Sequence, residues 1–365
     1  MMNYCAKIKY SLYTAVSGSF EEMVTALLER ISVSEIPVRL VFFDAPADNG
    51  MYVCRRDNLL ALVHKQFPAN CPVVSYVAQP PLGAGLVMEV HALQADPDDS
   101  LSYRNHEGFP YVVLDNADGH FLFAGGFHAD VKSQTHYEQS VVVFSLIQGL
   151  LEKEGVPVHG IVRQWNYIEQ ITGCTGVDQH YQMFNNARSD FYAGTSWADG
   201  YPAATGIGAC CGGVLVDLDA AVFNRDGCFV TPIDNKLQVA AHAYSDQVLV
   251  AADRQKKTPK FERAKSMTFD SRRLVYISGT AAIRGEERLT GVGLARQFQI
   301  TMENIAQLTG EARLCLLRIY LKEPCFYEEV RQLVDELGLT IPVVYLWANV
   351  CREELLIEIE GIAVE

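Results

Sequence analysis

The sequence has no apolar run that approaches the roughly 18 residues of a membrane-spanning helix. Its start, MMNYCAKIKYSLYTAVSG, lacks the apolar stretch of a secretory signal peptide. Ten cysteines are present, but they are scattered and form no paired C-x-x-C sets with the spacing of a zinc site. We therefore expect a soluble, cytoplasmic protein with reduced thiols, no membrane contact and no disulfide framework.

Signatures of common catalytic and cofactor sites are also missing. The nine histidines form no H-E-x-x-H motif and no order typical of a serine hydrolase triad. The glycine-rich segment GIGACCGG lacks both the P-loop lysine and the glycine spacing of a dinucleotide site. We therefore expect neither a metal ion nor an organic cofactor.

Positive charge is scarce, since the formal net charge is -14 and the sequence pI is about 5.1. Such a surface repels phosphate backbones, so we expect no nucleic-acid partner. The densest basic run is DRQKKTPKFERAK at 253–265, which we interpret as a solvated connector.

What the sequence does contain is an internal repeat. The segment FLFAGGFHAD at 121–130 is similar to VYISGTAAIRG at 275–285, because each is an apolar strand that runs into a turn of small residues. In both halves a helix, a strand, a second helix and further strands follow in the same order. Matched positions carry similar side chains: Arg163 over Arg318, Trp165 over Tyr320 and Asp217 over Glu358.

The repeat predicts two tandem copies of one α+β unit. We expect an N-terminal unit at 1–250, which includes an extra N-terminal segment, and a C-terminal domain at 251–365. A pseudo-twofold or pseudo-threefold arrangement would leave a cleft between the copies, where pockets commonly form. Roughly the first 110 residues stand outside the repeat, and we expect their strands to complete the sheet of the first half.

The closing segment CREELLIEIEGIAVE places two carboxylates in an apolar strand. Residues two apart in a strand share a face, so Glu358 and Glu360 point the same way. Such a row is either an exposed sheet edge or the floor of a site.

The second copy resembles the RidA (YjgF) family, from FERAKSMTFDSRRLVYISGTAAI through LIEIEGIAV. The resemblance implies the chorismate-mutase-like α+β fold, with mixed sheets packed by helices, and a family that forms trimers. In that family an arginine after the proline of the penultimate strand holds the substrate carboxylate. The corresponding stretch here, IPVVYLWANV, has no arginine, so the deaminase activity of the family is not implied.

Both copies together resemble the chorismatases over roughly residues 110–365. One departure is Ala187, where that family usually has glycine, and another is the divergent first hundred residues. The resemblance implies a cofactor-free enzyme that releases pyruvate from chorismate and forms 3-hydroxybenzoate, with or without some 4-hydroxybenzoate, or a dihydroxycyclohexadienoate. The motifs that carry it are VRQWNYI (162–168), FNNARSDFY (184–192), YPAATGIG (201–208), FERA (261–264) and NVCREELLIEIE (349–360).

The resemblance also implies roles for individual residues. Arg188 and Arg263 would clamp the carboxylates of chorismate, because a planar guanidinium pairs with a carboxylate in a way that lysine does not. Glu358 would be the general acid, since apolar neighbours desolvate it and raise its carboxyl pKa. Glu360 would support it from behind or face outward. Alternatively, both arginines are surface residues and both glutamates lie on a solvated edge.

Four further residues are candidates for the cleft. Thr205 and Gly206 lie in a run of small residues that would let a ring approach the backbone. Tyr345, with Trp347 on the same strand face, would wall the pocket or belong to the core. Cys351 stands seven residues before Glu358, and in the chorismatases a cysteine there is typical of hydroxybenzoate formers; the alternative is a buried structural cysteine.

Two other functions stay open on the sequence alone. One is an imine or enamine deaminase of the RidA type, and the other is a non-catalytic binder of small ligands that keeps the duplicated fold. The sequence leaves a monomer and a homotrimer equally open.

Overall fold

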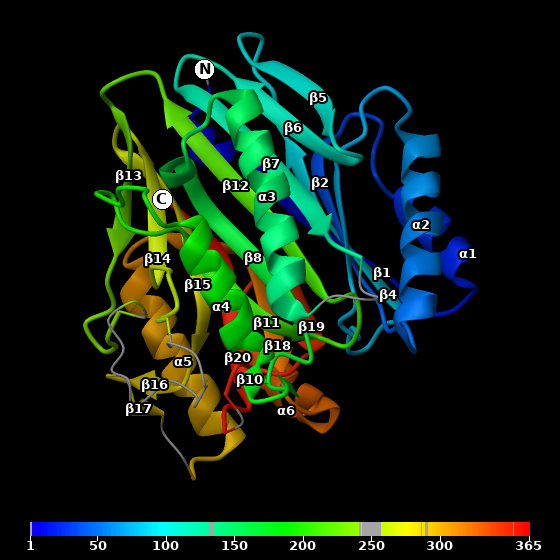
Figure 1. Ribbon diagram of the computed structural model, residues 1–365, viewed down its shortest axis with the longest axis vertical. Coiled ribbons are helices and arrows are strands. Elements are labelled where there is room, and N and C mark those ends of the chain that lie inside the picture. The colour runs from blue at the N-terminus through cyan, green and yellow to red at the C-terminus, as the bar shows by residue number, and fades with distance from the viewer. Residues whose placement is uncertain are drawn as a thin grey trace.

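The computed structural model describes residues 2–130, 135–240, 242, 257–285, 287–288, 291–352 and 354–365. Three α+β units follow one another along the chain, each with its own mixed sheet (Figure 1). Within the described residues, no helix is long and apolar enough to cross a membrane. The predicted boundary between residues 250 and 251 lies outside the described residues and stays a prediction, as do residues 253–256 of the basic run.

The first unit is a four-stranded sheet of order β1-β4-β2-β3 with two helices. Strands β2 and β3 are parallel, and the other pairs are antiparallel. A capping box between Ser19 and Glu22 begins the first helix by satisfying its free backbone N–H groups. The elements are η1 (Tyr4–Ala6), β1 (Ile8–Ala15), α1 (Phe20–Leu28), β2 (Ile36–Phe43), α2 (Asn49–Gln66), β3 (Val73–Val77) and β4 (Leu86–Leu93).

The second unit is a six-stranded sheet of order β11-β8-β12-β7-β6-β5. Helix α3 begins at a capping box of Thr135 and Glu138 and ends at Gly155, whose φ of 66° suits a residue without a side chain. The elements are β5 (Ser100–His106), β6 (Phe109–Asp115), β7 (Gly119–His128), α3 (His136–Glu154), η2 (Val158–Gly160), β8 (Ile161–Glu169), β9 (Cys174–Thr175), β10 (Asp178–Gln179), α4 (His180–Phe191), β11 (Ala203–Ala209) and β12 (Val214–Phe223).

The third unit repeats that order as β19-β18-β20-β15-β14-β13. The duplication predicted from the sequence is thus confirmed, with the same strand order and the same parallel pair in both sheets. The elements are β13 (Cys228–Ile233), β14 (Ala264–Phe269), β15 (Arg272–Ala281), β16 (Ile283–Arg284), β17 (Glu287–Arg288), α5 (Leu294–Thr309), β18 (Arg313–Leu321), η4 (Pro324–Phe326), α6 (Tyr327–Glu336), β19 (Val343–Trp347) and β20 (Ile357–Val364).

Of the strands in the first 110 residues, β5 joins the middle sheet as expected, but β1 to β4 form a sheet of their own, and for them that expectation was wrong. Its order β1-β4-β2-β3 is the same as β7-β12-β8-β11 and β15-β20-β18-β19, so it is a third and shorter version of the unit. The divergent sequence did not reveal this relation, because the first unit has no counterparts of β5 and β6 or of β13 and β14, the strands that begin the other two sheets.

The helices lie outside and the sheets face one another. In each unit an apolar cluster joins the helices to the outer sheet face, and a fourth cluster draws on the inner faces of all three sheets. Val41, Trp165 and Tyr320 occupy matched positions on β2, β8 and β18, and all three belong to that shared core. The three sheets therefore surround a common centre, and clefts form where one unit meets the next.

Candidate active site

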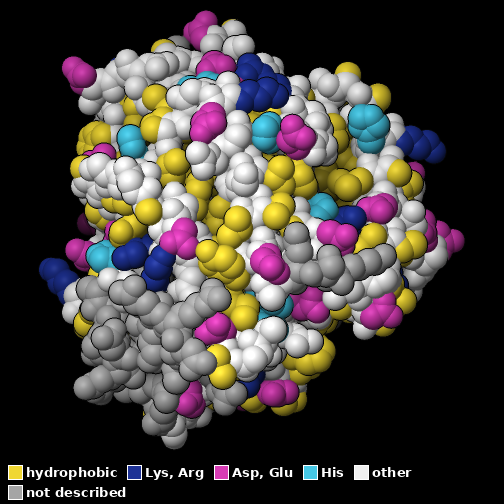
Figure 2. All heavy atoms as spheres, in the orientation of Figure 1, with side chains coloured by type: hydrophobic (Ala, Val, Ile, Leu, Met, Phe, Trp, Pro, Cys, Tyr) yellow, Lys and Arg dark blue, Asp and Glu magenta, His cyan; other side chains and the backbone are white. Residues whose placement is uncertain are grey.

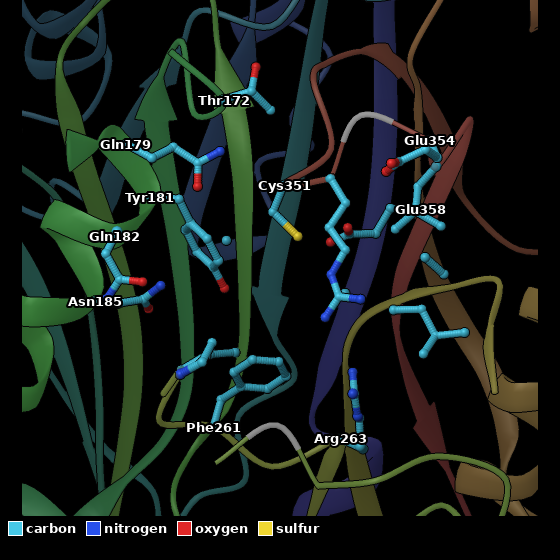
Figure 3. Close-up of a pocket in the computed structure, with 18 of the residues that line it drawn as sticks. Thr172, Gln179, Tyr181, Gln182, Asn185, Phe261, Arg263, Cys351, Glu354 and Glu358 are labelled. Atoms are coloured by element: carbon cyan, nitrogen blue, oxygen red, sulfur yellow. The ribbon is translucent and has the colours of Figure 1, made fainter. Parts of the chain in front are cut away.

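A cavity of about 410 Å³ lies between the second and third units (Figure 3). The second unit contributes α4 and β11, with Tyr181, Gln182 and Asn185 on one wall. The third unit contributes the opposite wall and the floor. In Figure 3 the side chain of Cys351 lies between the two walls, with Arg263, Glu354 and Glu358 on the far side.

Glu358 lies in the floor of this cavity on the central strand β20 and is 5% exposed. Burial and the neighbouring charge of Glu360 raise the pKa of its carboxyl to about 8. The carboxyl is therefore protonated at neutral pH, as a general acid must be. Because β20 lies between β15 and β18, the alternative of a solvated edge strand is wrong.

Gly279 explains how the strand next to Glu358 leaves room for that carboxyl. A β-bulge interrupts the β15–β20 ladder between Ile277 and Thr280. A Cβ added at Gly279 would overlap Oε1 of Glu358, so any larger residue there would displace the carboxyl.

Arg263 and Arg352 supply positive charge to the cavity. Both line it, and the charge of each opposes the rise of the Glu358 pKa, which shows that they lie close to that carboxyl. Arg263 is buried, and its Nη2 donates a hydrogen bond to the carbonyl of Val239 at 3.1 Å. It belongs to the wall of the cavity and not to a solvated connector, and Lys265 beyond it is buried as well.

Arg188 lies behind the wall formed by α4. It is fully buried and is not among the residues that line the cavity. Its Nη2 donates to Oδ1 of Asn185 at 2.6 Å, and Asn185 itself faces the cavity. In this structure Arg188 therefore reaches the cavity through Asn185, and its predicted direct contact with a substrate stays a prediction.

Gly206 and Thr205 lie on opposite faces of β11. Gly206 lines the cavity, and a Cβ there would come 2.8 Å from the ring of Tyr181. Thr205 points to the other side, where its hydroxyl accepts from the backbone N–H of Gly279 at 2.9 Å. Thr205 thus holds the bulge beside Glu358 in place without facing the cavity.

Cys351 lines the cavity, whereas Tyr345 lies elsewhere. Burial, with a smaller effect of Glu358, raises the pKa of the Cys351 thiol to about 12, so it stays protonated. Tyr345 packs edge-on against Tyr327 with ring centroids 5.4 Å apart, outside the cavity.

Sequence reasoning missed several lining residues, namely Tyr181, Gln182, Asn185, Phe261 and Arg352. Tyr181 and Asn185 stand four apart on α4, so helical periodicity could have placed both on the face that carries the cavity wall. Arg352 follows Cys351 directly in a segment outside helices and strands, where no periodicity predicts a direction. Among the described residues, no group of three or more His, Cys, Asp or Glu is placed to hold a metal ion.

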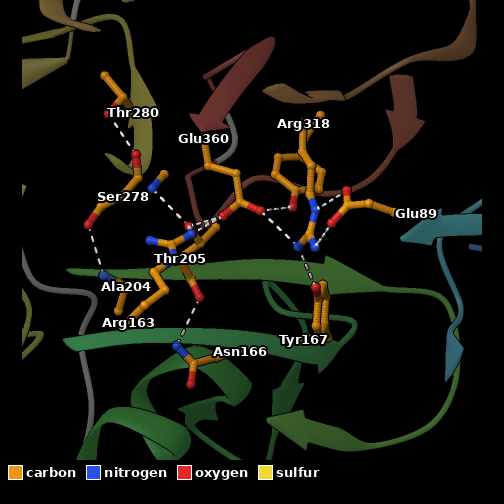
Figure 4. Close-up of polar contacts among 12 residues, drawn as sticks. Glu89, Arg163, Asn166, Tyr167, Ala204, Thr205, Ser278, Thr280, Arg318 and Glu360 are labelled. Atoms are coloured by element: carbon orange, nitrogen blue, oxygen red, sulfur yellow. Dashed lines mark hydrogen bonds and ion pairs between the residues drawn. The ribbon is translucent and has the colours of Figure 1, made fainter. Parts of the chain in front are cut away.

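Glu360 lies on the same face of β20 as Glu358 but outside the lining of the cavity, in a buried polar network (Figure 4). Its carboxylate accepts from the Tyr320 hydroxyl at 2.7 Å and from Nη1 of Arg318 at 3.1 Å. It also accepts from Arg163 and Thr205. Glu360 is therefore an inward residue that stands behind the general-acid candidate, and the outward alternative is wrong.

Ion pairs in this network link each unit to the next. Arg39 of the first unit pairs with Asp219 of the second at 2.8 Å, and Arg163 of the second pairs with Glu360 of the third. Arg318 of the third pairs with Glu89 of the first at 2.6 Å, which closes the ring. The three arginines, Arg39, Arg163 and Arg318, occupy the matched positions of β2, β8 and β18.

Comparison with known proteins gives one consistent relationship. The profile of a family described as "Chorismatase FkbO/Hyg5-like, N-terminal" matches residues 103–219. A 3-hydroxybenzoate synthase from Streptomyces hygroscopicus is 28% identical over 268 residues, which cover 67% of this chain and 74% of that protein. A chorismatase from Streptomyces rapamycinicus is 29% identical over 245 residues, covering 61% of this chain and 69% of the relative.

The fold agrees with that relationship. A crystal structure of a chorismatase superposes with a TM-score of 0.68 and covers 98% of this chain and 99% of the other, at 19% sequence identity. The resemblance to the chorismatases that the motifs predicted is confirmed, and so is the α+β fold with mixed sheets.

Proposed function

We propose that this protein converts chorismate to pyruvate and a hydroxybenzoate, mainly the 3-isomer. The observation that carries the proposal is the carboxyl of Glu358, whose pKa is raised to about 8 in the floor of a cavity that also holds two arginines. The sequence relatives are a 3-hydroxybenzoate synthase and chorismatases, which supports the same chemistry.

Substrate binding depends on the positive charge of the third unit. Chorismate is a dianion, and the protein as a whole carries a net charge of -14, so attraction must come from charge inside the cavity. Arg263 and Arg352 supply it from the wall that also carries Glu358. The amides of Gln182 and Asn185 on the opposite wall offer donors and acceptors to the ring hydroxyl.

Glu358 would start the reaction by protonating the methylene carbon of the enolpyruvyl ether. The ether carbon then becomes an oxocarbenium centre, and the bond between the ether oxygen and ring carbon 3 breaks, so pyruvate leaves with that oxygen. The ring keeps the oxygen of its 4-hydroxyl, which bonds to carbon 3 as its bond to carbon 4 breaks, and loss of the hydrogen on carbon 3 gives the 3-isomer. Loss of the hydrogen on carbon 4 without this shift gives the 4-isomer. Hydroxybenzoate and pyruvate together contain all the atoms of chorismate, whereas a dihydroxycyclohexadienoate requires one added water. The Glu358 carboxylate, left without its proton, takes up the proton that the ring loses as it becomes aromatic.

Cys351 would favour the aromatic product. Its protonated thiol is a weak hydrogen-bond partner, so it orients an attacking water poorly beside Glu358. An amide or carboxyl side chain at that position would hold such a water and favour the diene-diol.

The two rival functions fit the cavity less well. The edge strand β19 carries no arginine for the carboxylate of an imine substrate. Keeping a buried carboxyl protonated at neutral pH, beside a second buried carboxylate, costs free energy of folding. A non-catalytic binder does not require such a group.

A coupled pyruvate assay tests the proposal. Purified protein is incubated with chorismate, pyruvate is followed with lactate dehydrogenase, and products are separated by chromatography. We expect stoichiometric pyruvate and 3-hydroxybenzoate. Saturable chorismate binding without pyruvate would support the binder instead, and hydrolysis of an imine substrate would support the deaminase.

We also propose that the protein acts in the cytoplasm as a monomer. The three units of one chain already surround a common centre, which trimeric relatives of the RidA fold would need three chains to build. Light scattering after gel filtration tests this, and a mass near 40.5 kDa is expected.

A further inference from the structure

A second cavity, of about 230 Å³, lies between the first and second units. Its walls come from α2 and β3 on one side and from β6, β7 and β12 on the other. Figure 2 shows apolar side chains gathered in a hollow between helix α2 and the strands of the second sheet. This cavity is separate from the candidate active site, with which it shares no lining residue.

The two cavities occupy equivalent places in the repeated fold. Strand β3 pairs with β2 from Arg39↔Val73 onward, just as β11 pairs with β8 from Arg163↔Ala203 onward. Val74 and Tyr76 therefore take the places of Ala204 and Gly206, and each pair lines its own cavity. The larger side chains explain why the second cavity is smaller.

The second cavity lacks an acid in its floor. Asp217 is the counterpart of Glu358, but it is not among the residues that line this cavity. Its Oδ1 accepts from the Ser75 hydroxyl and from the backbone N–H of Gly126, each at 2.7 Å, which hold the short side chain behind the wall. The floor of this cavity therefore offers no acid to a ligand, and the carboxyl in its lining is that of the exposed Glu107.

Much of the lining is apolar, and its polar side chains are Arg56, His128, Glu107 and Tyr76, whose hydroxyl already donates to Asp44. The Glu107 carboxylate is exposed, so water screens its repulsion of an anion. Leu60, Val74, Phe109 and Leu215 present flat and branched apolar surface. The same cavity also presents the guanidinium of Arg56. Apolar walls with a few placed polar groups are typical of sites for small organic molecules.

Arg56 is able to receive an anion. Its Nε and Nη2 donate to one oxygen of Asp57 at 3.1 and 2.9 Å, and that carboxylate is exposed. The Arg56 side chain is 17% exposed and that of Asp57 is 60% exposed, so water screens the pair from the Asp57 side and a carboxylate that enters the cavity can compete for the guanidinium. Since Arg56 presents a planar fork, a bidentate pair with a carboxylate is favoured.

His128 offers an acceptor on the other side of the cavity. Its Nδ1 donates to the carbonyl of Gly126 at 2.8 Å, because a carbonyl oxygen can only accept. Burial and the charge of Arg56 lower the pKa of this imidazole to about 4, so the ring is neutral and Nε2 carries a lone pair. A hydroxyl on a bound ring could donate to it.

We propose that the cavity between the first and second units binds a small planar aromatic carboxylate, with its carboxylate on Arg56 and its ring among Leu60, Val74 and Phe109, and does not convert it. A hydroxyl substituent would add a hydrogen bond to His128. The class includes hydroxybenzoates, so the product of the proposed reaction is one candidate ligand, although the lining alone supports the site.

Calorimetric titration with 3-hydroxybenzoate, benzoate and the neutral benzamide tests the proposal. Wild-type protein should bind two equivalents of 3-hydroxybenzoate, and Arg263→Ala should retain the one held at the second cavity. Arg56→Gln should weaken that binding about tenfold or more, the effect of losing a charge-assisted hydrogen bond. Leu60→Trp should remove it by filling the space.

Arg30→Gln is the matched control, because Arg30 is an exposed arginine of the same unit outside this cavity. Melting curves check that each variant is folded. Arg56→Gln and Leu60→Trp should keep wild-type pyruvate release, which separates this proposal from the proposed function.

A single equivalent that disappears in Arg263→Ala and is unchanged in Arg56→Gln and Leu60→Trp would overturn the second site. Benzamide binding as tightly as benzoate at that site, or unchanged affinity in Arg56→Gln, would overturn the role of the carboxylate and with it the proposal.

Discussion

Arg318 and Glu89 form a doubly hydrogen-bonded ion pair at 2.6 and 2.9 Å, although 229 residues separate them in the sequence. The pair is buried and joins the last sheet to the first. Arg318 also donates to Glu360 at 3.1 Å, and Glu360 stands two residues from the general-acid candidate. The ring of ion pairs therefore joins the three units and also holds Glu360, which lies next to the part of β20 that forms the floor of the cavity.

We predict that Glu89→Gln destabilises the fold strongly. Arg318 pairs with Glu89 and Glu360, and the substitution leaves its buried guanidinium with Glu360 alone. Breaking a buried pair typically costs about 3–5 kcal/mol. Urea denaturation measures the loss. Glu328→Gln breaks an exposed pair with Arg331 and is the control, for which no measurable change is expected. Equal midpoints for both variants would contradict a structural role of the ring.

We predict that Glu358→Gln lowers the rate of pyruvate release by about 10²- to 10⁴-fold, the usual cost of losing a general acid. Glutamine keeps the shape of the side chain and removes the transferable proton, so chorismate should still bind. Glu354→Gln alters another carboxyl that lines the same cavity and should be milder. Full activity of Glu358→Gln would end its assignment as the acid.

Glu360→Gln is a different experiment, because Glu360 lies in the ion-pair ring and not in the cavity. We expect its main effect on the melting temperature, with a smaller direct effect on turnover than that of Glu358→Gln. A variant that melts like wild type but has lost pyruvate release would show a chemical role for Glu360 instead.

The raised pKa of Glu358 predicts how activity and stability depend on pH. Pyruvate release should fall as the pH rises through about 8, because the acid then loses its proton. Between the ordinary carboxyl pKa, near ~4.3, and about 8, the folded state holds a proton that the unfolded state has released. Raising the pH across this window therefore lowers the free energy of unfolding.

Glu358→Gln removes this pH-dependent contribution to the free energy of unfolding. The stability of the variant relative to wild type should therefore increase from pH 5 to pH 9. Thermal unfolding at several pH values, together with a pH–rate profile, measures both effects. A wild-type rate that stays constant from pH 7 to pH 9.5 would show that the carboxyl of Glu358 is not the group that limits turnover.

We predict that Arg263→Ala weakens chorismate use, measured as kcat/KM, by about 2 kcal/mol or more, the effect of losing a charge-assisted bond in a buried site. Arg263→Lys should recover only part, because lysine keeps the charge without the planar fork. Arg188→Ala should also impair catalysis, here through the loss of its bond to Asn185. If both alanine variants kept wild-type kinetics and only melted earlier, the two arginines would be structural.

We predict that Cys351→Gln diverts product toward the dihydroxycyclohexadienoate while pyruvate release continues. The amide would hold a water in the cavity next to Glu358, where the protonated thiol does not. Chromatography of the products measures the ratio, and Cys325→Gln, at an exposed cysteine, is the control. An unchanged ratio at normal turnover would remove Cys351 from the choice of product.

Much of this protein follows from local patterns in its sequence. Strand alternation placed Glu358 and Glu360 on one face, and the repeated order of elements predicted the matching sheets of the second and third units. The resemblance to the chorismatases, carried by motifs that contain Arg263, Cys351 and Glu358, located one wall of the cavity. The strand alternation and the repeated order of elements were visible because periods of two and about 3.6 residues are set by neighbours along the chain.

Only the tertiary structure decided what those side chains meet. It turned Thr205 and Glu360 toward the centre and left Gly206 and Glu358 in the cavity, set Arg188 behind Asn185, and placed Tyr345 against Tyr327. It also made the N-terminal segment a third unit whose Glu89 meets Arg318. The physical reason is that such contacts arise where separate sheets pack, between residues that are far apart in sequence, and no local periodicity records which faces will meet.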